Sequence, residues 1–217
     1  MTQILSTKKL SKVLKNKLYD AKIELVEKNF IQTKAVVFET PQLNDYLVFT
    51  SKEAVKSVLK SDIKNVHSIS CLCVGSKTRS FLEKKGFTVI ESADYAEELI
   101  QIIESKYKTN SFTFFCGNIR RNTIPAFFLQ NKIAYNEIVV YETKLKPHQI
   151  KESFDGVLFY SPSGVNSFLE NNTLRNKTCF CIGTTTAKAL ENKTKNIVIT
   201  SQPTVEHVID EVIKYYK

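Results

Sequence analysis

The sequence contains no tryptophan, one methionine, five prolines and only six glycines among its 217 residues. So few glycines leave little material for phosphate-cradling loops, and neither G-x-x-x-x-G-K-[ST] nor G-x-G-x-x-G occurs. A G-x-S-x-G nucleophile elbow is also missing. No apolar run approaches the roughly 18 residues that a membrane span needs. Nothing therefore supports a nucleoside triphosphate or dinucleotide site, an α/β-hydrolase or a membrane-spanning protein.

The N-terminal residues and the cysteines indicate in which cellular compartment the protein is expected. Residues 1–4 lack the basic head, hydrophobic centre and small-residue cleavage site of a secretory signal, so a cytosolic location is expected. Two C-x-C pairs, Cys71/Cys73 and Cys179/Cys181, fit strands, and no histidine is interleaved with them or adjoins Cys116. Metal-ligand spacing is absent. We predict reduced, structural thiols that behave as small hydrophobic side chains.

The net charge of +9 favours anionic partners: nucleic acid, a phosphorylated ligand or a polycarboxylate. The lysines are scattered, with no block of five or more like charges, which is also typical of an ordinary solvated surface. A nucleic-acid binder would show a basic stripe with interleaved aromatic residues, and none is found.

The sequence also repeats itself. VFTSKEAVKSVL (48–59) resembles LFYSPSGVNSFL (158–169), and CLCVGSKTRSFL (71–82) resembles CFCIGTTTAKAL (179–190). A third pair, 92–107 and 201–216, follows in the same order, and the offsets are 110, 108 and 109. The opening ILST likewise corresponds to FFCG. A duplication of about half the chain explains this pattern.

Each repeat unit reads as strand, turn and helix, which indicates βαβ units and parallel sheets covered on both faces. Five strand candidates lie in the middle of the chain (LVFT, CLCV, TVIE, FTFF and IVVY) and five in the two ends (ILST, IELVE, VLFY, CFCI and IVIT). The predicted fold is α/β: two similar lobes, each a five-stranded parallel sheet flanked by helices, joined by a two-stranded hinge.

We predict a discontinuous lobe of residues 1–35 plus 147–217 and a continuous lobe of residues 36–146 that includes the hinge strands. The crossings are expected near 35–39 and 143–147. A cut into consecutive halves near Asn110 is the rival arrangement. That rival arrangement does not explain why the sequence becomes polar at 144–147.

Ligands of open parallel sheets bind beyond the carboxyl ends of the strands. Hydroxyl-rich turns stand at those points, at 50–51, 76–78, 161–164 and 184–186, with 116–118 as a fifth. Any one such Ser or Thr is ordinarily a helix N-cap. Equivalent turns in two lobes favour a ligand held between facing strand ends, and a cleft between domains is a common small-molecule site.

At this point the residues resemble a family. FTS-x-x-AV, VG-x-x-T, CGN-x-x-R-x-x-x-P, VVYET, DGVLFYSPSGV, IG-x-TTA and PT-x-x-x-x-x-x-x-I together are similar to uroporphyrinogen-III synthase, in order, from about Asn44 to the C-terminus. One departure is that Thr7 is followed by Lys8 and Lys9, where the family's first strand often ends in Thr-Arg-Pro.

The resemblance implies a cofactor-free, monomeric, cytosolic enzyme of haem and sirohaem precursor synthesis, with two lobes on a two-stranded linker. Its substrate is hydroxymethylbilane, a linear tetrapyrrole with two carboxylate side chains per pyrrole. Loss of the terminal hydroxyl gives an azafulvene. The last pyrrole then attacks through its substituted carbon, and a spiro intermediate recloses with that ring inverted. A transient contact with the upstream bilane-forming enzyme is a further expectation.

Tyr141 matches the family's tyrosine and is the catalytic candidate, with packing at a domain seam as the structural alternative. The substrate-binding candidates, which match the family's substrate-facing loops, are Ser51, Ser76, Thr78, Asn118, Ser161, Ser163, Gly164, Thr185 and Thr186. Lys52, Arg120 and Arg121 either add charge-assisted hydrogen bonds or are ordinary surface cations. No metal site, nucleic-acid contact or membrane contact is expected. The alternative function is a non-catalytic, two-lobed binding protein for an anionic ligand.

Overall fold

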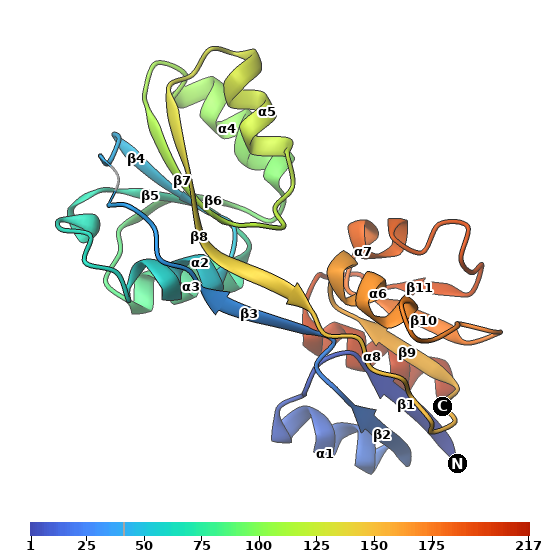
Figure 1. Cartoon of the computed structure of the whole chain (residues 1–217). Coiled ribbons are helices and arrows are strands. Elements are labelled where there is room, and N and C mark those ends of the chain that lie inside the picture. The colour runs from blue at the N-terminus through green and yellow to red at the C-terminus, as the bar shows by residue number, and fades with distance from the viewer. Residues whose placement is uncertain (41) are drawn as a thin grey trace. The chain divides into compact units, whose positions relative to one another are not determined.

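The computed structural model describes residues 1–40 and 42–217. The described chain divides into two compact α/β units (Figure 1). The first unit comprises Met1–Gln32 and Lys144–Lys217, and the second comprises Thr33–Thr143. The division predicted from the sequence places both boundaries three residues further along the chain, at 35 rather than 32 and at 146 rather than 143.

The first unit is built on a parallel sheet with strand order β11-β10-β9-β1-β2. Helices α1 and α8 cover one face of this sheet, and α6 and α7 cover the other. Neighbouring residues of β1 show this double burial, because Ile4 packs on the first face and Leu5 on the second. The elements are β1 (Thr2–Ser6), α1 (Lys12–Asp20), β2 (Ile23–Glu27), β9 (Gly156–Phe159), α6 (Pro162–Leu169), β10 (Thr178–Cys181), α7 (Thr184–Lys188), β11 (Ile197–Ile199) and α8 (Val205–Tyr216).

The second unit has strand order β3-β8-β7-β4-β5-β6. Helices α2 and α3 pack on one face of this sheet, and α4 and α5 on the other. The elements are β3 (Ile31–Ala35), β4 (Tyr46–Phe49), α2 (Lys52–Val58), the 3-10 turn η1 (Val66–Ser68), β5 (Cys71–Val74), α3 (Ser76–Lys84), β6 (Val89–Ala93), α4 (Ala96–Lys106), β7 (Phe112–Gly117), α5 (Thr123–Gln130) and β8 (Tyr135–Leu145).

The prediction counts five parallel strands in the second unit and sets two hinge strands apart from them, near 35–39 and 143–147. Within the described residues this sheet has six strands, because β3 joins its edge beside β8 and runs in the opposite direction (Figure 1). β8 is eleven residues long, so part of it extends past β7 and leaves backbone groups for β3 to pair with. Four of the five β3 side chains are exposed, which explains why its sequence, IQTKA, lacks the apolar signal of the other strands.

The sequence repeat is visible in the strand register. In the second unit Val48 pairs with Leu72, and in the first unit their repeat partners, Leu158 and Phe180, pair with each other. The match proposed for the opening strand is wrong by two residues. Val48 faces Phe114 and Leu158 faces Ser6, so Phe114 corresponds to Ser6 and not to Ile4.

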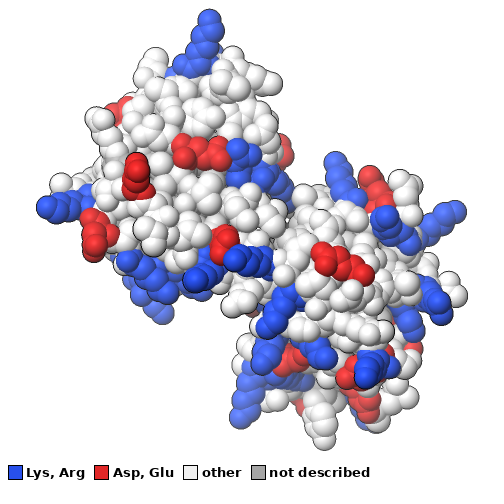
Figure 2. Space-filling view, in the orientation of Figure 1, with Lys and Arg blue, Asp and Glu red and all other residues white. Residues whose placement is uncertain are grey.

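Charged side chains of both signs are interspersed on the face that Figure 2 shows. Ion pairs tie several of them together, including Lys106 with Glu91 at 2.8 Å. Each such exposed pair contributes only ~0–1 kcal/mol to the free energy of unfolding, so each unit is stabilised mainly by its own apolar core. None of the described helices is long and apolar enough to cross a membrane.

All five cysteines are buried and unpaired. Burial raises the pKa of Cys71, Cys116, Cys179 and Cys181 to about 12, and that of Cys73 to about 11. A raised pKa leaves the thiol protonated at neutral pH, and the thiolate is the reactive form. Among the described residues no group of three or more His, Cys, Asp or Glu side chains is placed to hold a metal ion.

We expect the native protein to react with iodoacetamide at pH 8 far more slowly than a free cysteine does, because its thiols are both protonated and inaccessible. Mass spectrometry should find fewer than one label per molecule under conditions that fully alkylate the protein unfolded in guanidinium. Rapid labelling of any one cysteine in the native protein would show that its surroundings are not as described.

Candidate active site

Three residues proposed from the sequence come together at the carboxyl edge of the second sheet. Ser51 follows β4, Asn118 follows β7, and Tyr141 lies in the neighbouring strand β8. They meet because parallel strands all end at the same edge of a sheet. The Ser51 hydroxyl donates a hydrogen bond to the Tyr141 hydroxyl at 3.1 Å.

An irregularity in β8 decides that Tyr141 faces this edge. Cys116 pairs with Val139, but the next residue, Gly117, pairs with Tyr141, so Val140 is an extra residue in the ladder. Val140 is fully buried. Bulges of this kind re-aim side chains and are frequent beside active sites. Without the bulge Val140 would oppose Gly117, and Tyr141 would point to the other face.

Gly117 and Asn118 fit around the tyrosine. An added Cβ at Gly117 would lie 2.4 Å from the Tyr141 ring carbon Cζ and 2.8 Å from its hydroxyl oxygen, so only glycine permits this close approach. The Asn118 backbone N–H donates to the Tyr141 carbonyl at 3.1 Å, and its side-chain oxygen accepts from the Thr143 N–H at 2.7 Å. Asn118 therefore fixes the β8 backbone on both sides of residue 142.

The hydrogen bonds of Ser51 leave the proton of Tyr141 available. The Ser51 oxygen accepts from the Ala54 N–H at 3.1 Å as the N-cap of α2, and its single proton goes to the Tyr141 oxygen. Among the described residues no acceptor takes the Tyr141 proton within hydrogen-bond distance. Burial raises the pKa of Tyr141, and the hydrogen bond from Ser51 opposes this rise only in part. At neutral pH the group is a neutral phenol that can donate a hydrogen bond or a proton.

The other two candidates of the second unit, Ser76 and Thr78, begin helix α3 and make no hydrogen bond with Tyr141. Ser76 is exposed, whereas Thr78 is buried. The turn before them needs Gly75, whose φ of +90° lies in the left-handed region. Ser76 thus faces solvent, while Thr78 packs inside its own turn.

The candidates of the first unit lie on two helix starts. The Ser161 oxygen caps α6 by accepting from the Gly164 N–H at 3.1 Å, and it lies 3.0 Å from the Ser163 oxygen. Thr185 and Thr186 lie in the first turn of α7, where Thr185 is half-buried and Thr186 is buried. Hydroxyls and backbone N–H groups therefore line the carboxyl edge of this sheet also.

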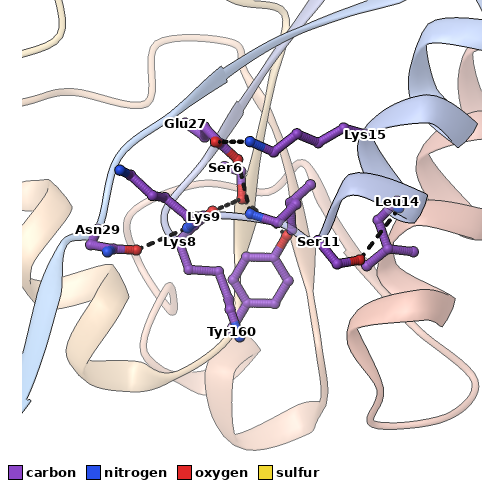
Figure 3. A network of polar contacts seen from close by, with 10 residues as sticks. Ser6, Lys8, Lys9, Ser11, Leu14, Lys15, Glu27, Asn29 and Tyr160 are labelled. Atoms are coloured by element: carbon purple, nitrogen blue, oxygen red, sulfur yellow. Dashed lines mark hydrogen bonds and ion pairs between the residues drawn. The ribbon is translucent and has the colours of Figure 1, made fainter.

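A second tyrosine–serine pair, which the sequence reasoning missed, lies at that edge (Figure 3). The Ser6 oxygen lies 3.1 Å from the Tyr160 oxygen, and the Ser6 proton is donated to the Lys8 carbonyl at 2.6 Å. Because a serine has one proton, Tyr160 donates to Ser6. Burial raises the pKa of Tyr160. The signal that could have revealed it is a tyrosine between a buried strand and a hydroxyl-rich turn.

The network of Figure 3 also holds the loop after β1. Glu27 accepts from the Leu10 N–H at 2.8 Å and pairs with Lys15, and Lys8 lies over the Tyr160 ring at 5.4 Å. Glu137 has the corresponding place in the second unit, because it faces Phe114 as Glu27 faces Ser6.

Glu137 accepts two hydrogen bonds from Arg120, at 2.7 and 2.9 Å. Arg120, one of the cations considered above, therefore fixes its own loop. A bidentate pair of this kind is directional as well as charge-assisted, so it holds the guanidinium in one place.

The chain's residues 12–210 match the sequence model of the uroporphyrinogen-III synthase HemD family. The chain belongs to the uroporphyrinogen-III synthase family. Its function is that of a cyclising lyase in tetrapyrrole biosynthesis. A search of curated protein sequences finds no significant match.

Solved structures of family enzymes share the fold. The chain is similar to uroporphyrinogen-III synthetase from Helicobacter pylori 26695, with 22% identity, a TM-score of 0.73, and 99% of this chain and 100% of that chain covered. A mutant uroporphyrinogen III synthase from the extremely thermophilic bacterium Thermus thermophilus is 12% identical with a TM-score of 0.69, covering 100% and 98% of the two chains. The wild-type enzyme of that bacterium, in a second crystal form, is 12% identical with a TM-score of 0.53, covering 100% and 96%.

Replacing Gly117 with alanine should displace the Tyr141 ring, because the new methyl group would overlap it. We expect the free energy of unfolding to fall by about 1–3 kcal/mol, as for other overpacked sites, and synthase activity to fall with it. Denaturant titration and product formation measure the two effects.

Gly183→Ala is the matched control. Nothing lies within 4 Å of a Cβ at that position, and its φ of 175° is extended backbone that any residue adopts. Its stability should change by less than about 0.5 kcal/mol. Equal stability of the two variants would contradict the close approach of Gly117 and Tyr141.

Proposed function

We propose that the chain converts hydroxymethylbilane to uroporphyrinogen III and that Tyr141 is its proton donor. One observation carries the assignment of Tyr141. Its hydroxyl oxygen accepts a hydrogen bond from Ser51, and among the described residues no group accepts the phenolic proton. Of the two tyrosine–serine pairs, only this one has the polarity that a donor needs, because Tyr160 gives its proton to Ser6.

The first step in this proposal is loss of the terminal hydroxyl of the bilane. Tyr141 donates its proton to that oxygen while the C–O bond breaks, and water leaves. The electron pair of the adjacent pyrrole nitrogen stabilises the resulting azafulvene. The last pyrrole then attacks, the spiro intermediate fragments and recloses, and the proton released as the ring regains aromaticity returns to Tyr141. One water is lost and no net proton is consumed.

Because burial raises the pKa of Tyr141, its phenol is protonated at neutral pH and has a proton to donate. Ser51 supports it by keeping the ring in one rotamer and by stabilising the phenolate that forms briefly. Its N-cap bond to Ala54 fixes the serine in turn.

The remaining candidates are proposed to bind the carboxylates of the substrate, one set of loops in each unit. Hydroxyls and backbone N–H groups at the carboxyl edge of a parallel sheet are suited to anionic groups. The set in the second unit is Ser76, Thr78 and Asn118, and that in the first unit is Ser161, Ser163, Gly164, Thr185 and Thr186. The buried hydroxyls of Thr78 and Thr186 would act by shaping their turns.

The main work left to the protein is positioning. The free bilane closes without inversion, so the enzyme must hold the chain in the folded conformation that leads to the spiro intermediate. Positioning of this kind supplies several kcal/mol of a barrier without a strong nucleophile. The monomeric state, the cytosolic location and the transient contact with the bilane-forming enzyme stay predictions from the resemblance.

The purified protein, given freshly made hydroxymethylbilane, should yield the type III isomer in excess over type I. Separation of the oxidised isomers by chromatography measures the ratio, and a reaction without protein gives the type I reference. If only type I forms at every protein concentration, the chain is the non-catalytic binding protein instead.

Tyr141→Phe should lower kcat by roughly 100-fold or more, because a general acid typically contributes a factor of 10²–10⁴. Its free energy of unfolding should fall by only about 1 kcal/mol, since one hydrogen bond is lost. Single-turnover rates and denaturant titration separate the two effects.

Tyr107→Phe is the control in the same unit. It removes a hydroxyl that donates to Glu91 at 3.2 Å, away from the site. That variant should keep its kcat. A Tyr141→Phe enzyme as fast as Tyr107→Phe would rule out the proton-donor role.

A further inference from the structure

A pocket of about 310 Å³ opens between the start of α2 and one face of α3 in the second unit. Its lining comes from the first residue of α2 and from one face of α3: Lys52, Ser76, Lys77, Ser80, Phe81 and Lys84. Helices α2 and α3 start at the carboxyl ends of β4 and β5, so Lys52 and Ser76 lie at the sheet edge that carries the candidate site, and the rest of the lining follows α3 to its last residue. Lys52 directly follows Ser51 in the chain.

The lining is positively charged and lacks a carboxylate among the described residues. The two nearest acidic residues of the same helices bind other cations. Glu53 pairs with Lys56 at 2.7 Å, and Glu83 pairs with Arg79 at 2.9 Å. The ammonium groups of Lys52 and Lys84 create a positive potential at the pocket that attracts anions and that salt screens.

The arrangement on α3 is regular. Ser76, Ser80 and Lys84 are spaced by four residues and so lie in one row along the helix. Arg79 and Glu83, also four residues apart, form a separate row and satisfy each other. The helix therefore separates the paired charges of Arg79 and Glu83 from the row of Ser76, Ser80 and Lys84, which lines the pocket.

The size of the pocket and its aromatic wall limit the class of ligand that it can bind. Pockets for whole small molecules span roughly 300–1,000 Å³, so this one lies at the lower limit and suits a single ring rather than a tetrapyrrole. Phe81 is half-buried and gives the pocket an apolar wall. A flat ring packed against an aromatic side chain, with anionic groups at its edge, fits these features.

We propose that this pocket binds one pyrrole ring of the substrate through its two carboxylate side chains. Lys52 and Lys84 bind the carboxylates, Ser76 and Ser80 add hydroxyl hydrogen bonds, and Phe81 packs against the ring. The inference rests on the proposed function. It adds Ser80 and Lys84 to the candidate binding residues and chooses the substrate-binding role for Lys52 over that of a surface cation.

The direct test is binding of a monopyrrole that carries two carboxylate side chains, followed by isothermal titration calorimetry. The probes are this dicarboxylate and its dimethyl ester. The wild-type protein should bind the dicarboxylate at least ten-fold more tightly than the ester. Lys52→Gln/Lys84→Gln should bind the dicarboxylate at least ten-fold more weakly than wild type.

The matched control is Lys108→Gln/Lys132→Gln, which removes the same charge from exposed positions elsewhere in the unit. It should bind the dicarboxylate as wild type does. Equal binding by the two double variants would overturn the proposal, and so would a dimethyl ester that binds as well as the dicarboxylate. Displacement by an equal concentration of inorganic phosphate would also overturn it, because the pocket would then be a general anion site.

Kinetics separate this proposal from the proposed function. With hydroxymethylbilane, Lys52→Gln/Lys84→Gln should raise KM at least ten-fold while kcat stays within two-fold and the type III isomer still dominates. If this double variant is active and its KM is unchanged, the proposed role of the pocket is wrong, whereas the proposed synthase function still holds. A wild-type protein that forms only type I would refute the proposed function, and the calorimetric comparison would still decide the pocket.

Discussion

Burial of two parallel sheets on both faces is the constraint on which the rest of the molecule depends. Parallel neighbours need crossover connections, so most strands are followed by a helix that covers one face. Within each unit the parallel strands end at the same edge of the sheet, and the loops that begin the helices gather there. Ser51, Asn118 and Tyr141 meet for this reason, although they are far apart in the sequence. The apolar clusters on the two faces of each sheet hold these loops in place.

Duplication supplied the scaffold twice, but the two copies carry different chemistry. Both have a tyrosine–serine pair at the carboxyl edge, with opposite hydrogen-bond direction. Ser51 donates to Tyr141 and leaves the phenolic proton available, whereas Tyr160 donates to Ser6, which gives its own proton to the Lys8 carbonyl. In the second unit the tyrosine lies in β8, and in the first unit it directly follows β9. Because of this difference, Tyr141 is a candidate proton donor, whereas Tyr160 makes a structural hydrogen bond.

The apolar strands could be predicted because buried parallel strands are nearly continuous hydrophobic runs, as in CLCV and GVLF. β3 could not, since an exposed edge strand such as IQTKA is stabilised by backbone pairing with β8 and has little apolar burial. Candidate residues were identified because hydroxyls recur after strands, a pattern of local sequence. Their partners were not, because Arg120 with Glu137, or Gly117 with the Tyr141 ring, are contacts between distant segments.

The sequence by itself determined the repeat, the α/β class, the order of the buried strands with their helices, and the family. Each of these follows from local hydrophobic periodicity or from comparison of one segment with another. Only the tertiary structure decided which residues touch and in which direction their protons point. The extra residue at Val140 turns Tyr141 toward Gly117 and Ser51, and the two rows of α3 separate the ion pair of Arg79 and Glu83 from the pocket-lining residues. Such outcomes depend on register and side-chain geometry across the sheet, which a linear pattern of residues does not contain.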